Sequence, residues 1–261
     1  MKDVLKEIIA KKREKVALAK QQLPQQELVQ RIMNMTPPKA FIGSINKPKQ
    51  ISLIAEIKKA SPSAGLIRQD FDPKQIAAIY QEAQVQAISV LTEEDFFQGS
   101  LDHLSQVRQT VSLPILRKDF ILDPYQVYES RYCGADAILL IAAILTQETI
   151  SELVNAASSL GLACLVEVHT EKELKKILKL KNIPLIGINN RDLRTLEVDF
   201  KITQTLFPLI PKDKVVVVES GIKNYQDVLF LRILGVSAVL IGEALMRADN
   251  IYNKIEELMG L

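Results

Sequence analysis

Residues 113–168, LPILRKDFILDPYQVYESRYCGADAILLIAAILTQETISELVNAASSLGLACLVEV, contain three short aliphatic runs separated by two longer stretches with helical spacing. The runs lack polar alternation, which is typical of parallel strands buried on both faces. Asp123 precedes Pro124, and this pair favours the start of a helix. Gly134 and Gly161 lie where the two helices should end. The stretch therefore predicts strand, helix, strand, helix and strand in that order.

The same alternation extends in both directions, from residue 51 to the end of the chain. Eight aliphatic runs occur, at residues 51–57, 87–92, 113–118, 137–143, 162–168, 184–190, 214–220 and 237–243. Their ends are on average about 27 residues apart, close to the roughly 30 residues of one strand–helix unit. Eight such units predict an α/β fold, a single (β/α)8 or TIM barrel over residues 51–261. A doubly wound open sheet is less suitable, because it usually has fewer strands and a GxGxxG turn after the first.

Capping signals between the runs support the helices. Asp72 precedes Pro73 as Asp123 precedes Pro124, and Thr146 is a suitable cap for the helix that follows it. Thr170 and Glu173 have the spacing of a capping box, in which each side chain accepts a backbone N–H of the first turn. Gly235 lies at a further predicted helix end.

Residues 1–50 lie outside the alternation and predict a helical N-terminal extension that packs on the barrel. Residues 2–19 and 25–34 resemble two helices separated by Pro24, and a proline-containing connection follows them. Such an extension could cap one end of the barrel or shield its active site, and the sequence leaves both alternatives open.

The composition excludes several classes of function. The 261 residues are 48% hydrophobic, and 33 Lys+Arg balance 31 Asp+Glu to give a net charge of +2. A net charge this small gives no strong field for polyanions, so we expect no nucleic-acid partner. No run is long enough to span a membrane, and the first twenty residues lack the apolar core of a signal peptide. We therefore expect a cytoplasmic protein without a membrane partner, and a monomer.

Metal and redox chemistry are not indicated. Cys133 and Cys164 have no CxxC spacing, and His103 and His169 are isolated from each other and from the cysteines. We therefore expect neither a metal nor a cofactor. His169 follows a predicted strand and is interpreted as a loop residue rather than a catalytic one.

Polar residues stand at the ends of five of the aliphatic runs, where the active sites of these barrels lie. They are Glu56, Lys58, Lys118, Glu167, Asn189 and Glu219. Side chains alternate between the barrel interior and the helix layer, and if the faces that carry these residues point inward, three carboxylates and two ammonium groups converge. Buried charges cost several kcal/mol unless they are paired, so the cluster predicts a catalytic site.

Glycines at the ends of the last two runs suggest a phosphate site. Gly221 follows Glu219 and Ser220, and Gly242 precedes Glu243. Backbone N–H groups at such positions can approach an anion, although two ordinary tight turns would give the same pattern. The segment 58–65, KKASPSAG, has neither helical nor strand periodicity, and we interpret it as a mobile substrate-binding loop.

Six motifs, in order, resemble the indole-3-glycerol phosphate synthase family. They are AEIKKASPSAG (55–65), LRKDFILDPYQ (116–126), LVEVH (165–169), IGINNRDL (186–193), VVESGI (217–222) and LIGEALM (240–246). The resemblance covers residues 51–247 and extends loosely to the N-terminal helices. It implies the decarboxylating ring closure of 1-(2-carboxyphenylamino)-1-deoxyribulose 5-phosphate to indole-3-glycerol phosphate, carbon dioxide and water. This is a lyase reaction of tryptophan biosynthesis that uses no metal or redox cofactor.

The resemblance also implies catalytic roles. Lys118 matches the general acid that protonates the substrate ketone, and we expect a neighbouring lysine to lower its pKa towards neutrality. Glu167 matches a carboxylate that handles a proton in the dehydration. Lys58 would hold the carboxylate that leaves as carbon dioxide, with an acid role in dehydration as an alternative. Glu56 and Asn189 would orient the lysines and the substrate hydroxyls.

Binding roles follow in the same way. The resemblance places Glu219 and Ser220 in the mouth, and the phosphate on backbone groups of Gly221 and Gly242 with Ser61 nearby. Arg191 is a further candidate for anion binding, without a definite target. The Glu243 carboxylate would oppose a phosphate unless its side chain points away.

Two other classes of enzyme fit parts of the pattern. One is another phosphate-binding barrel enzyme, such as an amino-sugar isomerase or a tryptophan synthase α chain, for which the combination of Glu56, Lys58 and Lys118 is unexpected. The other is an aldolase that uses Lys58 or Lys118 as a Schiff-base nucleophile. A barrel without catalytic activity is disfavoured by the charged residues at the mouth.

Overall fold

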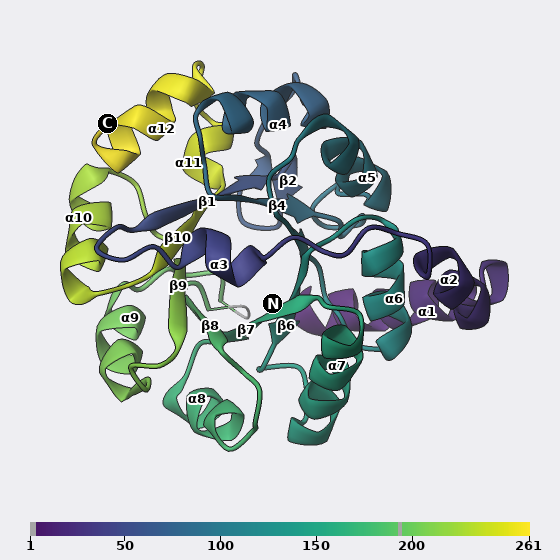
Figure 1. The fold of residues 1–261 in the computed structure, drawn as a ribbon. Helices are drawn as coiled ribbons and strands as arrows, with labels where there is room; N and C mark the ends of the chain where they lie inside the picture. Colours follow the sequence, from purple (N-terminus) through teal and green to yellow (C-terminus); the bar gives the residue numbers. More distant parts are fainter. Residues whose placement is uncertain (1–3, 193–194) are drawn as a thin grey trace.

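A computed structural model describes residues 4–192 and 195–261 (Figure 1). The start of the predicted first helix, residues 2 and 3, lies outside the described residues, as does Leu193, the last residue of the IGINNRDL motif. Within the described ranges, eight parallel strands form a closed barrel in the order β1-β10-β9-β8-β7-β6-β5-β4. The strands are β1 (Ser52–Ile57), β4 (Ala87–Leu91), β5 (Ile115–Lys118), β6 (Ala137–Ile141), β7 (Ala163–Val168), β8 (Leu185–Asn189), β9 (Val215–Glu219) and β10 (Ala238–Ile241).

Each strand lies within one predicted aliphatic run, so the (β/α)8 fold is confirmed. The helices that surround the barrel are α4 (Pro73–Glu82), α5 (Leu101–Thr110), α6 (Pro124–Tyr132), α7 (Gln147–Ser159), α8 (Glu171–Leu178), α9 (Lys201–Leu206), continued by the 3₁₀ turn η1 (Phe207–Leu209), α10 (Tyr225–Leu234), α11 (Glu243–Met246) and α12 (Ile251–Met259).

The predicted caps are present in the structure. The Asp72 carboxylate accepts the N–H groups of Lys74 and Gln75, and Asp123 and Thr146 accept N–H groups in the first turns of α6 and α7. The glycines at three predicted helix ends, Gly134, Gly161 and Gly235, have φ angles of 91°, 73° and 100°. This left-handed region is where a helix can end on glycine without strain.

The capping box predicted at α8 forms only in part. The Thr170 hydroxyl accepts the Glu173 N–H at 3.2 Å, as expected. The Glu173 carboxylate, however, accepts the backbone N–H of His169 at 2.7 Å and not that of Thr170. It reaches one residue further because it also contacts the His169 ring.

Buried apolar side chains form an inner and an outer core. The inner core fills the barrel with residues that alternate along the strands, including Ile54, Leu165 and Val217. The outer core lies between the strands and the helices, and Val166 and Val218 belong to it. Glu56, Glu167 and Glu219 lie two residues beyond inner-core positions, so strand alternation turns their carboxylates into the barrel.

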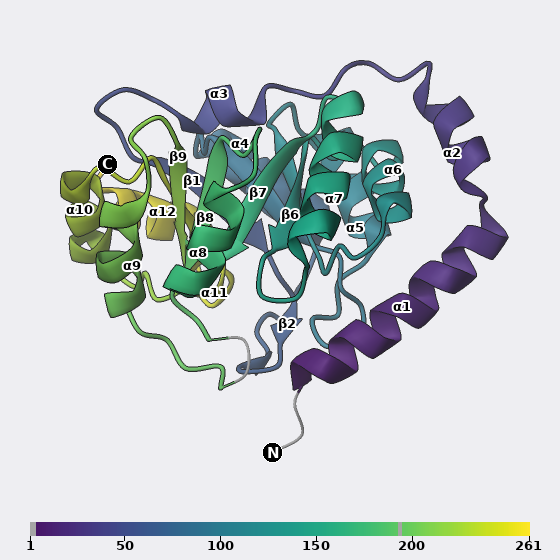
Figure 2. The ribbon, with the colours of Figure 1, turned by 90° about the horizontal axis from the view of Figure 1, so that it is seen from below.

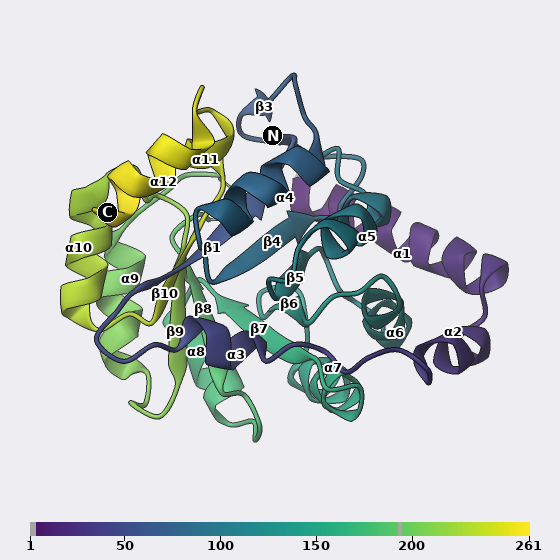
Figure 3. The same ribbon diagram turned by 45° about the horizontal axis from the view of Figure 1, so that its top comes forward.

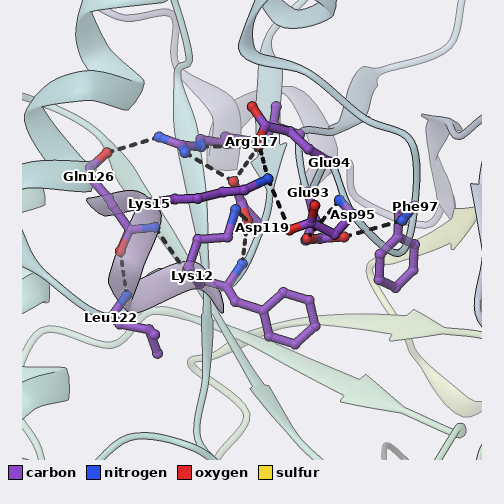
Figure 4. A network of polar contacts seen from close by, with 12 residues as sticks. Lys12, Lys15, Glu93, Glu94, Asp95, Phe97, Arg117, Asp119, Leu122 and Gln126 are labelled. Carbon is purple, nitrogen blue, oxygen red and sulfur yellow. Dashed lines mark hydrogen bonds and ion pairs between the residues drawn. The ribbon is translucent and has the colours of Figure 1, made fainter. Parts of the chain in front are cut away.

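The helices before β1 contact both ends of the barrel. The short α3 (Phe41–Ile45) buries Phe41 and Ile45 in the inner core, at the end of the barrel opposite β2 (Ala60–Ser61) (Figure 2). The other two helices, α1 (Val4–Gln22) and α2 (Gln25–Ile32), lie outside the helix ring against α6 (Figure 3). At the carboxyl ends of the strands, Lys12 of α1 forms an ion pair with Asp119, 2.7 Å apart (Figure 4).

Candidate active site

The predicted site residues come together at the carboxyl end of the barrel. All eleven line one cavity of about 630 Å³. They are Glu56, Lys58, Ser61, Lys118, Glu167, Asn189, Arg191, Glu219, Ser220, Gly221 and Gly242. The cavity also has apolar walls, which include Phe97, Phe120 and Leu139. A concave site with apolar walls and a few convergent charges is the usual form of a small-molecule site.

Two lysines and three carboxylates form ion pairs in the floor of this cavity. The Lys118 Nζ lies 3.0 Å from Glu219 Oε2 and 3.7 Å from Glu167 Oε2. The Lys58 Nζ lies 2.8 Å from Glu56 Oε1. The side chains of Glu167 and Glu219 are each 1% exposed, whereas Lys118 is 15% exposed. The ammonium groups therefore face the opening and the carboxylates lie beneath them.

The expected lowering of the Lys118 pKa is wrong. Burial does act to lower the pKa of the ammonium, but Glu219, Glu167 and Glu56 together outweigh it and raise the pKa above its usual value. The carboxylates that the alternation turns inward lie beside Lys118, so they determine its charge. Lys118 is therefore fully protonated in the ligand-free protein at neutral pH.

For the Glu219 carboxyl, the effect of burial on the pKa outweighs that of the neighbouring lysine. Burial raises its pKa to about 7, and the neighbouring Glu167 adds to this, while Lys118 acts to lower it. Burial has the largest effect because the side chain is withdrawn from solvent on all sides.

The raised pKa predicts a pH-dependent stability. A carboxyl with a folded pKa of about 7 and an ordinary value of 4.5 contributes stability below pH 4.5 that is lost as the pH rises through 7. Between pH 5 and pH 8 the native protein should therefore lose about 1–3 kcal/mol of unfolding free energy relative to Glu219→Gln, which cannot ionise. Urea unfolding of both proteins at the two pH values measures this difference. A difference that is the same at pH 5 and pH 8 would contradict it.

Two consecutive asparagines stand at the end of β8, where Asn189 is the last residue of the strand and Asn190 follows it. The Asn189 amide donates to Glu167 Oε2 at 3.1 Å and its carbonyl oxygen accepts the Arg191 N–H at 3.0 Å. Asn190 is fully buried, accepts from Thr203 and donates to the Ser220 carbonyl at 3.1 Å. Ser220 has a φ of 65°, which is uncommon for a residue other than glycine. Asn190 thus stabilises a strained turn beside the cavity, a role that the sequence analysis missed.

Arg191 and Glu243 contact each other. The guanidinium Nη2 lies 3.6 Å from Glu243 Oε2, and Nη1 donates to the Leu196 carbonyl at 2.9 Å. The Glu243 carboxylate also contacts Arg247 at 3.1 Å. The negative charge that would oppose a phosphate is therefore shared by two arginines.

The loop after β1 contains a small hairpin, although the sequence showed no strand periodicity there. Its strands are only two residues each, β2 (Ala60–Ser61) and β3 (Gly65–Leu66), too short for a periodic pattern. Arg68 donates to the Met246 and Ala248 carbonyls and thereby connects this loop to the segment after β10.

His169 lies in the loop after β7, as interpreted, and its ring is buried against the site. The side chain is 8% exposed, and Nε2 lies 3.3 Å from Glu167 Oε1. Its position directly after β7, two residues beyond a catalytic candidate, was the available signal. Across residues 4–192 and 195–261, no group of three or more His, Cys, Asp or Glu side chains is arranged to hold a metal ion. Within the same ranges, no helix combines the length and apolar character needed to cross a membrane.

The fold and this cavity define the class of the protein as a (β/α)8-barrel enzyme, with buried charges at the carboxyl ends of the strands. The sequence profile described as "Indole-3-glycerol phosphate synthase" matches residues 5–258. The chain belongs to the indole-3-glycerol phosphate synthase family.

Individual relatives agree with this assignment. An indole-3-glycerol phosphate synthase of Acetivibrio thermocellus is 51% identical over 220 residues, 84% of each chain. One of Acidithiobacillus ferrooxidans is 49% identical over 261 residues, 99% of each chain. Among solved structures, 3-hexulose-6-phosphate synthase of Salmonella typhimurium is similar in fold, with a TM-score of 0.62 and 14% identity over 80% of this chain and 97% of that one. A tryptophan synthase α-subunit variant of Pyrococcus furiosus has a TM-score of 0.62 and 17% identity, with 80% and 98% coverage. At these identities the two structures show the fold alone.

Proposed function

We propose that this protein is an indole-3-glycerol phosphate synthase, which closes the indole ring of 1-(2-carboxyphenylamino)-1-deoxyribulose 5-phosphate and releases carbon dioxide and water. The observation that carries the proposal is the Lys118 ammonium, held between Glu219 at 3.0 Å and Glu167 at 3.7 Å and facing the cavity. An acid and two carboxylates in contact can supply and remove the protons that the reaction requires.

Ring closure begins when the aromatic carbon that bears the carboxylate attacks the ketone carbon. The electron pair of the C=O bond moves to oxygen, and Lys118 donates a proton to it. An alkoxide is a stronger base than an amine, so even an ammonium with a raised pKa can protonate it. Breaking the bond to the carboxylate releases carbon dioxide and restores the aromatic ring.

Dehydration then forms the carbon–carbon double bond of the new five-membered ring. The new hydroxyl leaves as water after it gains a proton, and a base removes a proton from the neighbouring carbon. We assign the base to Glu167, whose Oε2 is oriented by the Asn189 amide at 3.1 Å. We assign to Lys58, in contact with Glu56 at 2.8 Å, the binding of the departing carboxylate and the supply of the second proton.

The phosphate is proposed to bind at the carboxyl ends of β9 and β10. Gly221 has a φ of 84° next to Ser220 at 65°, and successive backbone N–H groups in a tight turn can form a concave site for an anion. Gly242 and Ser61 line the same cavity. A side chain at Gly242 would place its Cβ 2.3 Å from the Glu56 carboxylate, so glycine is required there.

The function is tested by adding the carboxyphenylamino substrate to the purified protein without added metal. We expect the fluorescence of an indole product to appear, with one carbon dioxide released per product. No product at millimolar substrate would refute the proposal. Borohydride added during turnover distinguishes the aldolase alternative, because a stable adduct on Lys58 or Lys118 would show Schiff-base chemistry.

We also propose that the protein acts in the cytoplasm as a monomer, with residues 1–50 as an extension of a barrel formed by 51–261. The near-neutral net charge and the role in amino-acid biosynthesis support the proposed location and oligomeric state. The contacts of α3 with the inner core support the packing of residues 1–50 on the barrel. Light scattering tests the oligomeric state, and cell fractionation tests the location.

A further inference from the structure

His169 lies between β7 and α8 with its ring in contact with two carboxylates. Nε2 is 3.3 Å from Glu167 Oε1, and Nδ1 is 3.3 Å from Glu173 Oε2. Among the described residues, neither Nε2 nor Glu167 Oε1 has an aligned hydrogen bond. A small rotation of the ring or the carboxylate would align these two buried atoms with each other.

The orientation of the histidine is fixed from the side of α8. The Glu173 carboxylate accepts the His169 backbone N–H at 2.7 Å, and the Thr170 hydroxyl begins the helix that carries Glu173. One carboxylate therefore holds both the backbone and the ring of His169. The opposite ring nitrogen is left facing Glu167.

The two oxygens of Glu167 have different surroundings. Oε2 accepts from the Asn189 amide at 3.1 Å and lies 3.7 Å from the Lys118 ammonium. Among the described residues, only the His169 imidazole is within ion-pair distance of Oε1. Without the imidazole, a buried oxygen of the proposed base would have no donor, and the carboxylate would be free to turn.

The charges around His169 come from four elements. Glu167 lies on β7, Glu173 on α8 and Glu219 on β9, while Lys118 of β5 contacts the first and third of these. Lys176 of α8 interacts with Glu173 as well. Burial acts to lower the pKa of the imidazole, but the carboxylates outweigh it and raise the pKa above its usual value. Both ring nitrogens then carry protons over a wider range of pH.

We propose that His169 is a positioning residue for the reaction: held by Glu173, it donates a hydrogen bond to Glu167 Oε1 and keeps that carboxylate directed at the substrate. The catalytic consequence rests on the proposed function, whereas the contact itself does not. The sequence of contacts is Glu173, His169, Glu167 and then Lys118.

The contact can be tested in the ligand-free protein. The chain has two histidines, so NMR titration of the imidazole rings gives two curves, and His169→Gln identifies the one that belongs to His169. We expect the His169 pKa to lie above that of His103, whose pKa burial and Lys59 lower. Glu167→Gln and Glu173→Gln should each reduce the His169 pKa. Glu171→Gln is the matched control, because Glu171 lies on the same helix but pairs with Lys175 at the surface. A His169 curve that none of these variants moves would overturn the proposal.

The effect on catalysis is tested by kinetics over a range of pH. His169→Ala should reduce kcat on the order of tenfold with KM within about twofold, since a general base is misplaced but not removed. Loss of the imidazolium removes a positive charge from beside the proposed base, so the pH profile of kcat should shift relative to that of the native protein. His169→Gln, which places an amide nitrogen near the position of Nε2, should restore part of kcat.

The possible failures can be told apart. If the native protein does not turn over the substrate, the proposed function fails and the NMR titration still tests the contact. If it does, and His169→Ala keeps the native kcat and pH profile, the positioning role is refuted. A loss of kcat with an unshifted pH profile and a matching loss of thermal stability would show a structural role only, and would also overturn the proposal.

Discussion

Replacement of Lys118 by alanine is expected to reduce kcat by a factor of roughly 10²–10⁴, the usual contribution of a positioned acid. The ammonium is the group nearest to both Glu167 and Glu219, and its 15% exposure is towards the cavity. No other described cation is within ion-pair distance of the Glu219 carboxylate. The fold should survive, because Glu219 has a pKa of about 7 even beside the lysine and can be protonated when the lysine is absent. Steady-state kinetics together with circular dichroism measure both effects.

Lys172→Ala is a suitable control, because Lys172 lies on the surface helix α8 and does not line the cavity. It should leave kcat unchanged. Turnover by Lys118→Ala at the native rate would remove Lys118 from the mechanism. A collapse of the fold in that variant would instead show that the ion pairs are needed for stability, and Lys118→Gln would then be the variant to measure.

Replacement of Asp119 by alanine is expected to reduce the free energy of unfolding by about 3–5 kcal/mol, the range found when one partner of a buried ion pair is removed. The carboxylate is fully buried next to Lys118 and lies 2.7 Å from Lys12 Nζ and 2.9 Å from Arg117 Nη2 (Figure 4). It also accepts from the Thr92 hydroxyl at 2.6 Å. Its removal would leave two cations of low exposure without this partner. Chemical denaturation of both proteins measures the loss.

The pH dependence of this loss has a definite sign. Burial acts to raise the pKa of Asp119, but Lys12 and Arg117 outweigh it and hold the pKa well below its usual range. A depressed pKa contributes stability above the ordinary value of about 4 that is lost as the pH falls. The difference between native protein and Asp119→Ala should thus shrink in acid. Asp213→Ala, at an exposed ion pair with Lys214, should cost less than about 1 kcal/mol. An Asp119→Ala loss as small as this would contradict the prediction.

Most of the fold could be predicted from the sequence because its signals are local. A buried strand such as β9 reads as Val215–Val218 without interruption, and the caps Asp72 and Asp123 act on residues two or three positions away. The site could be predicted for a related reason. Charged residues at strand ends must meet once the barrel closes, so the convergence of Glu167 and Glu219 follows from topology and side-chain alternation.

The remaining features depend on contacts between distant segments. Asn190 was missed because its partner Thr203 lies 13 residues away on α9. The direction of the Lys118 pKa shift was wrong because it depends on distances to three carboxylates from three other strands. The role of His169 depends on Glu173 reaching past the helix cap, which a capping-box pattern does not indicate.

The docking of α1 has a consequence for the order in which the chain folds during synthesis. Lys20 of α1 contacts Asp123, 103 residues later, and Lys12 contacts Asp119. At typical synthesis rates of 5–20 residues per second, the partners of the helix are made roughly 5–20 s after the helix itself. During that interval its apolar stripe, with Ile8 and Val16, has no barrel to cover it. Helix α1 is thus synthesised well before its partners, and we expect it to be among the last of the described helices to reach its native position.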